Sequence, residues 1–254
     1  AEALLYAGGA IAERGSIEQG TTVSDYTPRE KQLGHSQYSA VCHLDHGGIH
    51  VNLIDTPGYR DFIGRALAVL PAVETAALVI NAQDGVDTIC RRVMDSAQKQ
   101  RLCRMIIVNK IDAEELDLEA LLADIRDAFG SECLPLNLPS ADGSSVVDCF
   151  FKPEHVDTMF SDVDRAHTRI VDQVVEVDEA LMELYLEQGE ELDPDQLHDP
   201  FEKALRQGHL IPVCFVSART GSGIKQLLNI FERLMPNPME GNPPRFLKGE
   251  GENP

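Results

Sequence analysis

Residues 109–112, Asn-Lys-Ile-Asp, could select a purine base, and they directly follow the apolar run Met105–Val108. The Asp112 carboxylate can accept two parallel N–H bonds from the Watson–Crick edge of guanine. Adenine lacks this pair of donors and would leave polar groups unpaired. The Asn109 amide can stabilise the loop and meet the other edge of the base, while the stem of Lys110 can lie along the base or the ribose. The alternative is a solvated strand-to-helix turn.

A second polar group, Asp55-Thr56-Pro57-Gly58, ends the strand-like run 49–54. The Asp55 carboxylate can reach a magnesium ion through water, and the amide of Gly58 can approach a terminal phosphate closely because glycine has no side chain. This pattern alone is weak evidence, since an ordinary turn at the end of a strand has the same composition.

A third group, Ser217-Ala218, follows the apolar run Ile211–Val216. The backbone N–H of Ala218 could donate to the carbonyl of guanine. The dipeptide has little meaning by itself, and its value comes from its position at the end of the next strand of the same sheet.

The elements that must position these groups form an alternating pattern. Short, continuously apolar runs suit strands of a parallel sheet that is buried on both faces. Runs with helical spacing lie between them, so the sequence predicts an α/β fold with a mostly parallel, doubly wound sheet. A hairpin of 38–44 and 49–54 is predicted from the turn residues 45–48. The predicted parallel strands and helices are Ala76–Ile80, Met105–Val108, Ile211–Val216, 118–129 and 227–234.

The alternation breaks between residues 131 and 209. Two strand-like pieces, 134–139 and 145–151, are followed by two helical stretches, one from Val156 to Val175 and one ending near Gly189. We expect a small inserted α+β subdomain at 131–209, within a main domain of 1–130 plus 210–236. The segment 237–254, rich in Pro, Gly and Asn, is expected to be a linker toward a second domain.

Composition limits the function classes. The formal net charge of −20 argues against a protein that neutralises a nucleic-acid backbone, so DNA is not an expected partner. Residues 131–209 hold 5 Lys and Arg against 19 Asp and Glu. This acidic block is either a solvated surface or a docking face for a basic protein patch.

Other features of the composition concern the compartment. No apolar run approaches the roughly 20 residues of a membrane span, so no membrane partner is expected. The six scattered cysteines, without a C-x-x-C pair, indicate buried free thiols in a reducing cytosol. The expected location is therefore cytoplasmic.

Together, the three polar groups resemble the switch II, guanine-specificity and final base-contact motifs of translational GTPases. The long interval between the second and third groups resembles elongation factor G, whose nucleotide domain carries an insert there. Residues 2–9 are similar to the first helix of that factor, and 25–36 to its first switch. The resemblance implies a sheet of the P-loop NTPase type. Yet the sequence contains no G-x-x-x-x-G-K-[ST], so we expect a fragment that begins just after the phosphate loop and is itself inactive.

Two departures from that family bear on chemistry. Gly34-His35-Ser36 stands where the family has Gly-Ile-Thr, and the Ser36 hydroxyl keeps an oxygen for magnesium. Tyr59 replaces the histidine that is thought to position the attacking water. A phenol with a pKa near 10 carries no positive charge at neutral pH, so weak GTP hydrolysis is expected.

The resemblance implies a GTP-binding domain of an elongation factor G-like protein that acts on the ribosome. The implied nucleotide ligands are Asp55, Gly58, Asn109, Lys110, Asp112, Ser217 and Ala218, with GTP or GDP as the nucleotide and Mg²⁺ near Ser36 and Asp55. By analogy with the family, the acidic insert would meet the stalk protein of the large subunit. The alternatives are a ribosomal protection or release-factor GTPase, and a docking scaffold without turnover.

Overall fold

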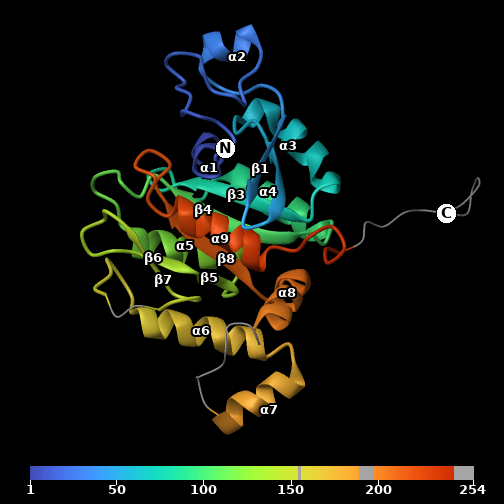
Figure 1. Ribbon diagram of the computed structural model, residues 1–254, viewed down its shortest axis with the longest axis vertical. Helices are drawn as coiled ribbons and strands as arrows, with labels where there is room; N and C mark the ends of the chain where they lie inside the picture. Colours follow the sequence, from blue (N-terminus) through green and yellow to red (C-terminus); the bar gives the residue numbers. More distant parts are fainter. Residues whose placement is uncertain (154–155, 189–196, 243–254) are drawn as a thin grey trace, which may run out of the picture.

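The computed structural model describes residues 1–153, 156–188 and 197–242. A four-stranded parallel sheet lies at its centre, in the order β3-β4-β8-β5 (Figure 1). The predicted parallel sheet is therefore confirmed. Every residue of β8 is buried, and in β4 only the last residue is not, because both faces of the sheet are covered. The strands are β3 (Thr75–Asn81), β4 (Cys103–Asn109), β8 (Ile211–Val216) and β5 (Cys133–Pro135).

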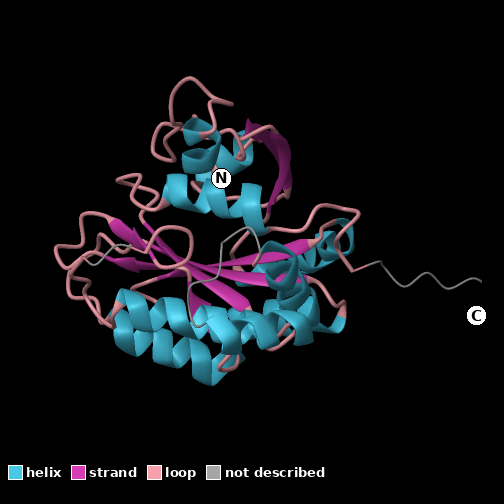
Figure 2. Cartoon of the chain, turned by 60° about the horizontal axis from the view of Figure 1, so that its bottom comes forward, coloured by secondary structure: helices cyan, strands magenta, loops and turns pink. Residues whose placement is uncertain are grey.

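Helices lie on both faces of this sheet (Figure 2). The first helix packs against the last, and α4 packs against both β3 and α5. The helices of the main fold are α1 (Glu2–Ala7), α2 (Pro28–Leu33), α3 (Ile63–Val69), α4 (Thr88–Lys99), α5 (Leu118–Phe129) and α9 (Ile224–Leu234), with short 3₁₀ turns at Arg60–Phe62 and Leu70–Ala72.

The predicted hairpin is present as a separate two-stranded antiparallel sheet of β1 (Ala40–His46) and β2 (Ile49–Asp55). Its turn is shorter than the four residues expected from the sequence. Gly47 and Gly48 have φ angles of 56° and 90°, the left-handed region that both central residues of a tight two-residue hairpin turn require. Glycine adopts this region without steric cost, so the hairpin closes at these two residues.

The region 131–209 differs from the prediction in three details. The expected strand 134–139 is two strands, of which β5 belongs to the main sheet and β6 (Asn137–Pro139) pairs with β7 (Val146–Asp148). The helix expected from Val156 begins only at Val163, where the Asp162 side chain caps α6 (Val163–Val175) by accepting two backbone N–H bonds. Next come α7 (Glu179–Gln188) and α8 (His198–Gln207), and α8 was not predicted. The expected helix end near Gly189 and the segment 243–254 lie outside the described residues.

The Asn137 side chain joins the β6–β7 pair to the main sheet. Its amide Nδ2 donates to the carbonyl of Phe215 at 3.1 Å, and its Oδ1 accepts the N–H of Phe215 at 2.7 Å. Asn137 is 1% exposed. The side chain thus acts as a peptide group, continuing the ladder along β8 beyond the point where β5 ends.

Replacing Asn137 by Leu should lower the free energy of unfolding by about 2 kcal/mol, because two buried backbone groups of Phe215 lose their partners. Urea denaturation followed by far-ultraviolet circular dichroism measures this loss. The matched control is Asn52→Leu, at an exposed position of the hairpin. Equal unfolding midpoints for Asn137→Leu and the control would show that the Asn137 bonds contribute nothing net.

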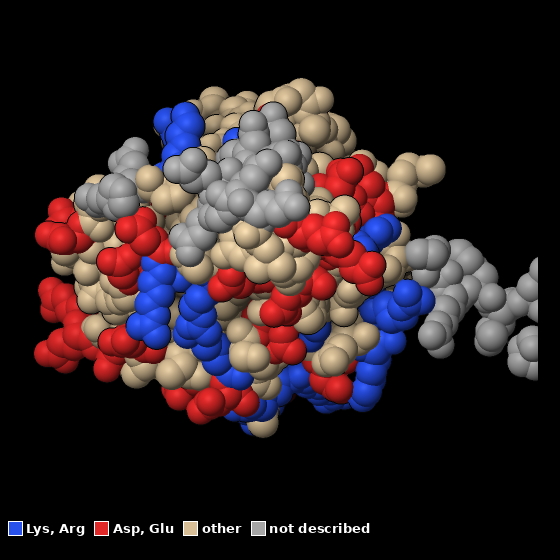
Figure 3. All heavy atoms as spheres, turned by 90° about the horizontal axis from the view of Figure 1, so that it is seen from below, with Lys and Arg blue, Asp and Glu red and all other residues tan. Residues whose placement is uncertain are grey.

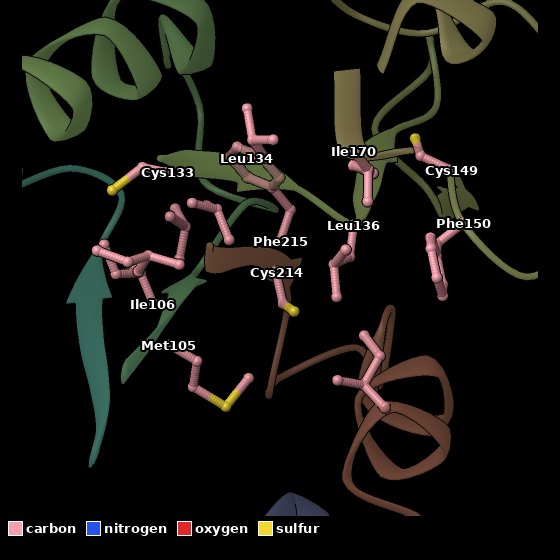
Figure 4. Packing of buried hydrophobic residues seen from close by; sticks show 14 of the residues in the cluster. Met105, Ile106, Cys133, Leu134, Leu136, Cys149, Phe150, Ile170, Cys214 and Phe215 are labelled. Atoms are coloured by element: carbon pink, nitrogen blue, oxygen red, sulfur yellow. The ribbon is translucent and has the colours of Figure 1, made fainter. Parts of the chain in front are cut away.

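One apolar core runs through the main sheet and the insert. Met105 of β4, Cys214 of β8 and Ile170 of α6 belong to the same buried cluster (Figure 4). All six cysteines are free thiols, and burial raises the pKa of Cys214 to about 12. Within the described residues, no helix combines the length and apolar character that a membrane crossing requires.

Candidate nucleotide site

The register of the parallel sheet brings the predicted base-selecting residues together. Asn109 at the end of β4 is level with Val216 at the end of β8, and these strands are neighbours. Ser217 and Ala218 therefore emerge beside the loop that follows Asn109. The N–H of Ile111 donates to the carbonyl of Val216 at 3.3 Å, which ties the two loops together at their base.

Direct contacts join the two loops further out. The Ser217 hydroxyl donates to the Asp112 carboxylate. The N–H of Ala218, which was expected to face a guanine carbonyl, donates to Oδ1 of Asn109 at 2.9 Å. We call Asn109, Asp112, Ser217 and Ala218 the base group, because they form one connected set at the carboxyl edge of the sheet. This edge is where open α/β sheets bind their ligands.

Lys110 lies in the middle of this loop with a φ angle of 69°. A non-glycine residue in the left-handed region costs on the order of 1 kcal/mol, and the surrounding structure must enforce it. The Lys110 side chain is exposed. The tied loop therefore presents a cation to solvent beside the base group, in the place expected for a residue that lies along a base or ribose.

Two arginines that the sequence analysis did not identify also reach the base group. The Arg219 guanidinium contacts Asp112 through Nε and Nη2, both 2.5 Å from Oδ2. Burial alone would raise the pKa of Asp112, but bonds from Ser217 and Arg219 outweigh burial and lower it. Arg14 donates to the carbonyls of Ala218 and Arg219 from the segment after α1. No motif spacing relates residue 14 to residue 219, so only the fold reveals this contact.

The predicted switch residues form a second group around a cavity of about 540 Å³. Ser36, Gly58 and Tyr59 all line it, so the two segments that resemble switches face each other here. A Cβ built on Gly58 would meet nothing within 4 Å, which leaves the backbone at this position open to a ligand. Asp55 is not among the lining residues, which are Ile17, Asp25, Gly34, His35, Ser36, Gly58, Tyr59, Arg60, Asp87 and Ile89.

Tyr59 is 59% exposed and packs against His35 from the other switch. The ring centroids lie 4.3 Å apart with an angle of 35° between the planes. The phenol at the position of the family histidine is therefore held by an imidazole that the sequence analysis did not single out. This contact sets the separation of the two segments at the cavity.

The oxygen donors at this cavity fit a hard cation. The Ser36 hydroxyl donates to Oδ1 of the buried Asp25 at 2.7 Å, and the Thr22 hydroxyl donates to Oδ2 at the same distance. A donating hydroxyl keeps both of its lone pairs, so Ser36 Oγ can still ligate a metal ion. Among the described residues, no group of three or more His, Cys, Asp and Glu side chains could hold a metal ion. Mg²⁺ needs only one or two protein ligands when phosphates and water complete its shell.

Glu30 organises the segment that carries Ser36. Its carboxylate is 0% exposed. Oε1 accepts the N–H groups of Gln37 and Tyr38, each at 2.9 Å, and Oε2 accepts the N–H and the hydroxyl of Thr27 at 3.0 and 2.7 Å. The residues at 27 and 30 form a capping box at the start of α2. The T-x-x-E spacing was a visible signal in the sequence, but it does not show that the carboxylate also closes the loop at Gln37 and Tyr38.

Comparisons with known proteins agree with this geometry. The family described as "Elongation factor Tu GTP binding domain" matches residues 1–237. The chain is 36% identical to an elongation factor G-like protein of Mycobacterium tuberculosis, over 98% of this chain and 37% of the relative. It is 32% identical to the tetracycline resistance protein TetW of Butyrivibrio fibrisolvens, over 90% of this chain and 33% of that protein.

A crystal structure of a protein from Thermus thermophilus superposes with a TM-score of 0.82 at 35% identity, covering 94% of this chain and 38% of that one. The chain thus spans between about a third and two fifths of the length of these relatives. The family model matches residues 1–237, and the fold has the α/β sheet with the base group at its carboxyl edge. The chain belongs to the elongation-factor family of translational GTPases, as its GTP-binding domain.

Proposed function

We propose that the base group selects guanine in GTP and GDP. The observation that carries this is the convergence of Asp112, Ser217 and Ala218 from loops about a hundred residues apart in sequence. Asp112 accepts from the N–H pair of guanine, and the N–H of Ala218 turns from Asn109 to the guanine carbonyl. Ser217 holds the carboxylate in place, and Lys110 covers the base or ribose.

The cavity between the switch segments takes the phosphate end. The open backbone at Gly58 would face the terminal phosphate, and Ser36 Oγ and Asp55 would hold Mg²⁺. A bound Mg²⁺ neutralises charge on the phosphate oxygens. Because Ser36 and Tyr59 line the same cavity, a nucleotide there contacts both segments and orders them. Hydrolysis or release removes that restraint.

Hydrolysis in this site is slow. The position after Gly58 holds a phenol that is packed on His35, and a phenol cannot become a cation near neutral pH. It therefore stabilises the developing charge of phosphoryl transfer less well than an imidazolium would. Tyr59 contributes packing and a hydrogen-bonding hydroxyl at this position.

Replacing Tyr59 by His should raise the rate of phosphate release from GTP by about tenfold or more in the presence of ribosomes, because an imidazole can orient water and carry charge. The assay uses the intact protein, with ATP as the competing substrate to check base selection. Tyr26→His is the matched control, since Tyr26 is exposed outside the cavity lining. If wild type and Tyr59→His release phosphate at the same brisk rate, Tyr59 does not limit the chemistry.

The relatives favour the ribosome as the partner. Two of them carry the names of an elongation factor G-like protein and a tetracycline resistance protein, so the chain functions as part of an elongation factor G-like cytoplasmic factor. On the face that α6, α7 and α8 occupy, acidic side chains form several clusters with Lys and Arg between them (Figure 3). This face suits a basic patch on the large-subunit stalk protein.

A second candidate function is a ribosome-docking domain that binds GTP without turnover. Tyr59 in place of the family histidine favours it. The phosphate-release assay separates the two candidate functions. A docking domain releases no phosphate, either as wild type or as Tyr59→His, but it still binds GTP in preference to ATP. A ribosomal protection or release-factor role shares the same site, and only the whole protein would distinguish it.

A further inference from the structure

The Asp112 carboxylate has little acceptor capacity to spare in this structure. Oδ1 accepts the Ser217 hydroxyl, and Oδ2 accepts both Nε and Nη2 of Arg219. A carboxylate oxygen offers about two acceptor sites. Oδ2 is therefore fully used by a single guanidinium. Guanine, which needs both oxygens of Asp112, cannot form its pair of bonds while Arg219 stays there.

We propose that Arg219 is an internal ligand of the base-selecting carboxylate, one that guanine must displace on binding. This inference rests on the proposed guanine site. The guanidinium presents adjacent N–H donors in a planar fork, as does the Watson–Crick edge of guanine. Arg219 therefore donates N–H bonds to Oδ2 of Asp112, and the base would also donate N–H bonds to this carboxylate.

Burial explains why the carboxylate requires a substitute. The Asp112 side chain is 13% exposed, whereas that of Arg219 is 78% exposed. A charge near the interior without partners is costly, but a guanidinium at the surface regains water easily when it leaves. Arg219 thus supplies Asp112 with a partner, and it can release Asp112 at a modest cost.

The backbone of the loop does not have to move for this exchange. Arg14 holds the carbonyls of Ala218 and Arg219, so the loop is anchored while the Arg219 side chain swings out. The Ala218 N–H is likewise held by Asn109 until a base carbonyl replaces it. Protein groups therefore make both of the polar contacts that are assigned to guanine.

Displacement affects guanine and adenine differently. Guanine separates Arg219 from Asp112 and supplies two donors in its place. Adenine offers no such donors, so Arg219 stays paired with Asp112 when adenine is present. Removing Arg219 should consequently help GDP and give no help to ADP.

The first test is the affinity of Arg219→Ala for GDP and ADP, measured by competition against a fluorescent GDP analogue. We expect GDP to bind about fivefold more tightly than to wild type, as for the loss of a partly exposed ion pair, with no gain for ADP. Arg92→Ala is the matched control, because it removes an exposed guanidinium on α4 away from the base group, and it should give no gain. An unchanged GDP affinity, or an equal gain for ADP or for Arg92→Ala, overturns the inference and leaves the guanine site standing.

The second test needs no nucleotide. Carbon-detected NMR follows the Asp112 carboxyl during titration of the 254-residue chain, with Asp112→Asn to assign the signal. The Asp112 pKa should rise in Arg219→Ala and stay unchanged in Arg92→Ala. A pKa that does not rise shows that the contact is absent in solution and overturns the inference. If the pKa rises but no variant of the intact protein binds GDP, the guanine site itself is wrong and the inference falls with it.

Discussion

Replacing Asp112 by Asn should convert the protein from a GDP binder into an XDP binder. Xanthine carries a carbonyl oxygen at C2 where guanine carries an amino group, and the Asn side chain can donate to that oxygen. Toward guanine, the same amide leaves a donor facing a donor. A site built on hydrogen bonds rejects a mismatched partner strongly, so we expect GDP affinity to fall by at least about 100-fold.

Competition binding with GDP and XDP measures this switch. Asp95→Asn is the matched control, because Asp95 lies exposed on α4 in an ion pair with Lys99. The control should leave the preference for GDP unchanged. A variant that loses both nucleotides would indicate a damaged loop, and one that keeps its preference for GDP would show that Asp112 does not read the base.

Replacing Glu30 by Gln should destabilise the protein by on the order of 3 kcal/mol at neutral pH. Each carboxylate oxygen of Glu30 accepts two bonds, and an amide replaces one acceptor by a donor that faces other donors. Urea denaturation at pH 7 measures the loss, and amide exchange at Gln37 and Tyr38 shows whether the Ser36 segment opens. Glu119→Gln, exposed on α5, is the control.

The effect of Glu30 depends on pH in a defined direction. Burial raises the pKa of its carboxyl, but hydrogen bonds from the Thr27 hydroxyl and from the N–H groups of Gln37, Thr27 and Tyr38 outweigh burial. The pKa falls from 4.5 to about 2. A lowered native pKa stabilises the protein fully above the unfolded value, and the contribution is lost as pH falls toward 2. The difference between wild type and Glu30→Gln should therefore be much smaller at pH 3 than at pH 7. A difference that does not vary with pH would contradict the charged state of Glu30.

Sequence alone predicted the strands that carry the base group, because continuous apolar runs indicate buried parallel strands. Since parallel strands end at one edge, the meeting of Asp112 with Ser217 followed from the fold class. The sequence prediction placed β5 in the insert, because this strand has only three residues and its apolar pattern continues past Pro135 into β6. The helix α8 was missed because Pro200 lies near its start and charged residues fill its exposed face.

The contacts that sequence could not predict depend on side chains that meet across the fold. Arg14 reaches a loop 204 residues away, and Arg219 returns 107 residues to Asp112. Arginines are common on surfaces, and neither residue lies in a recognisable motif. His35 beside Tyr59 was equally hidden, because nothing in the spacing of two loops fixes how their rings pack.

The amide of Asn137 ties the β6–β7 pair to strand β8 of the main sheet. Removing the insert would strip partners from Phe215, a core residue only two positions before Ser217. Strands are stiff over such a short distance. The residue at 137 is thus constrained by the same strand that carries the base-reading loop.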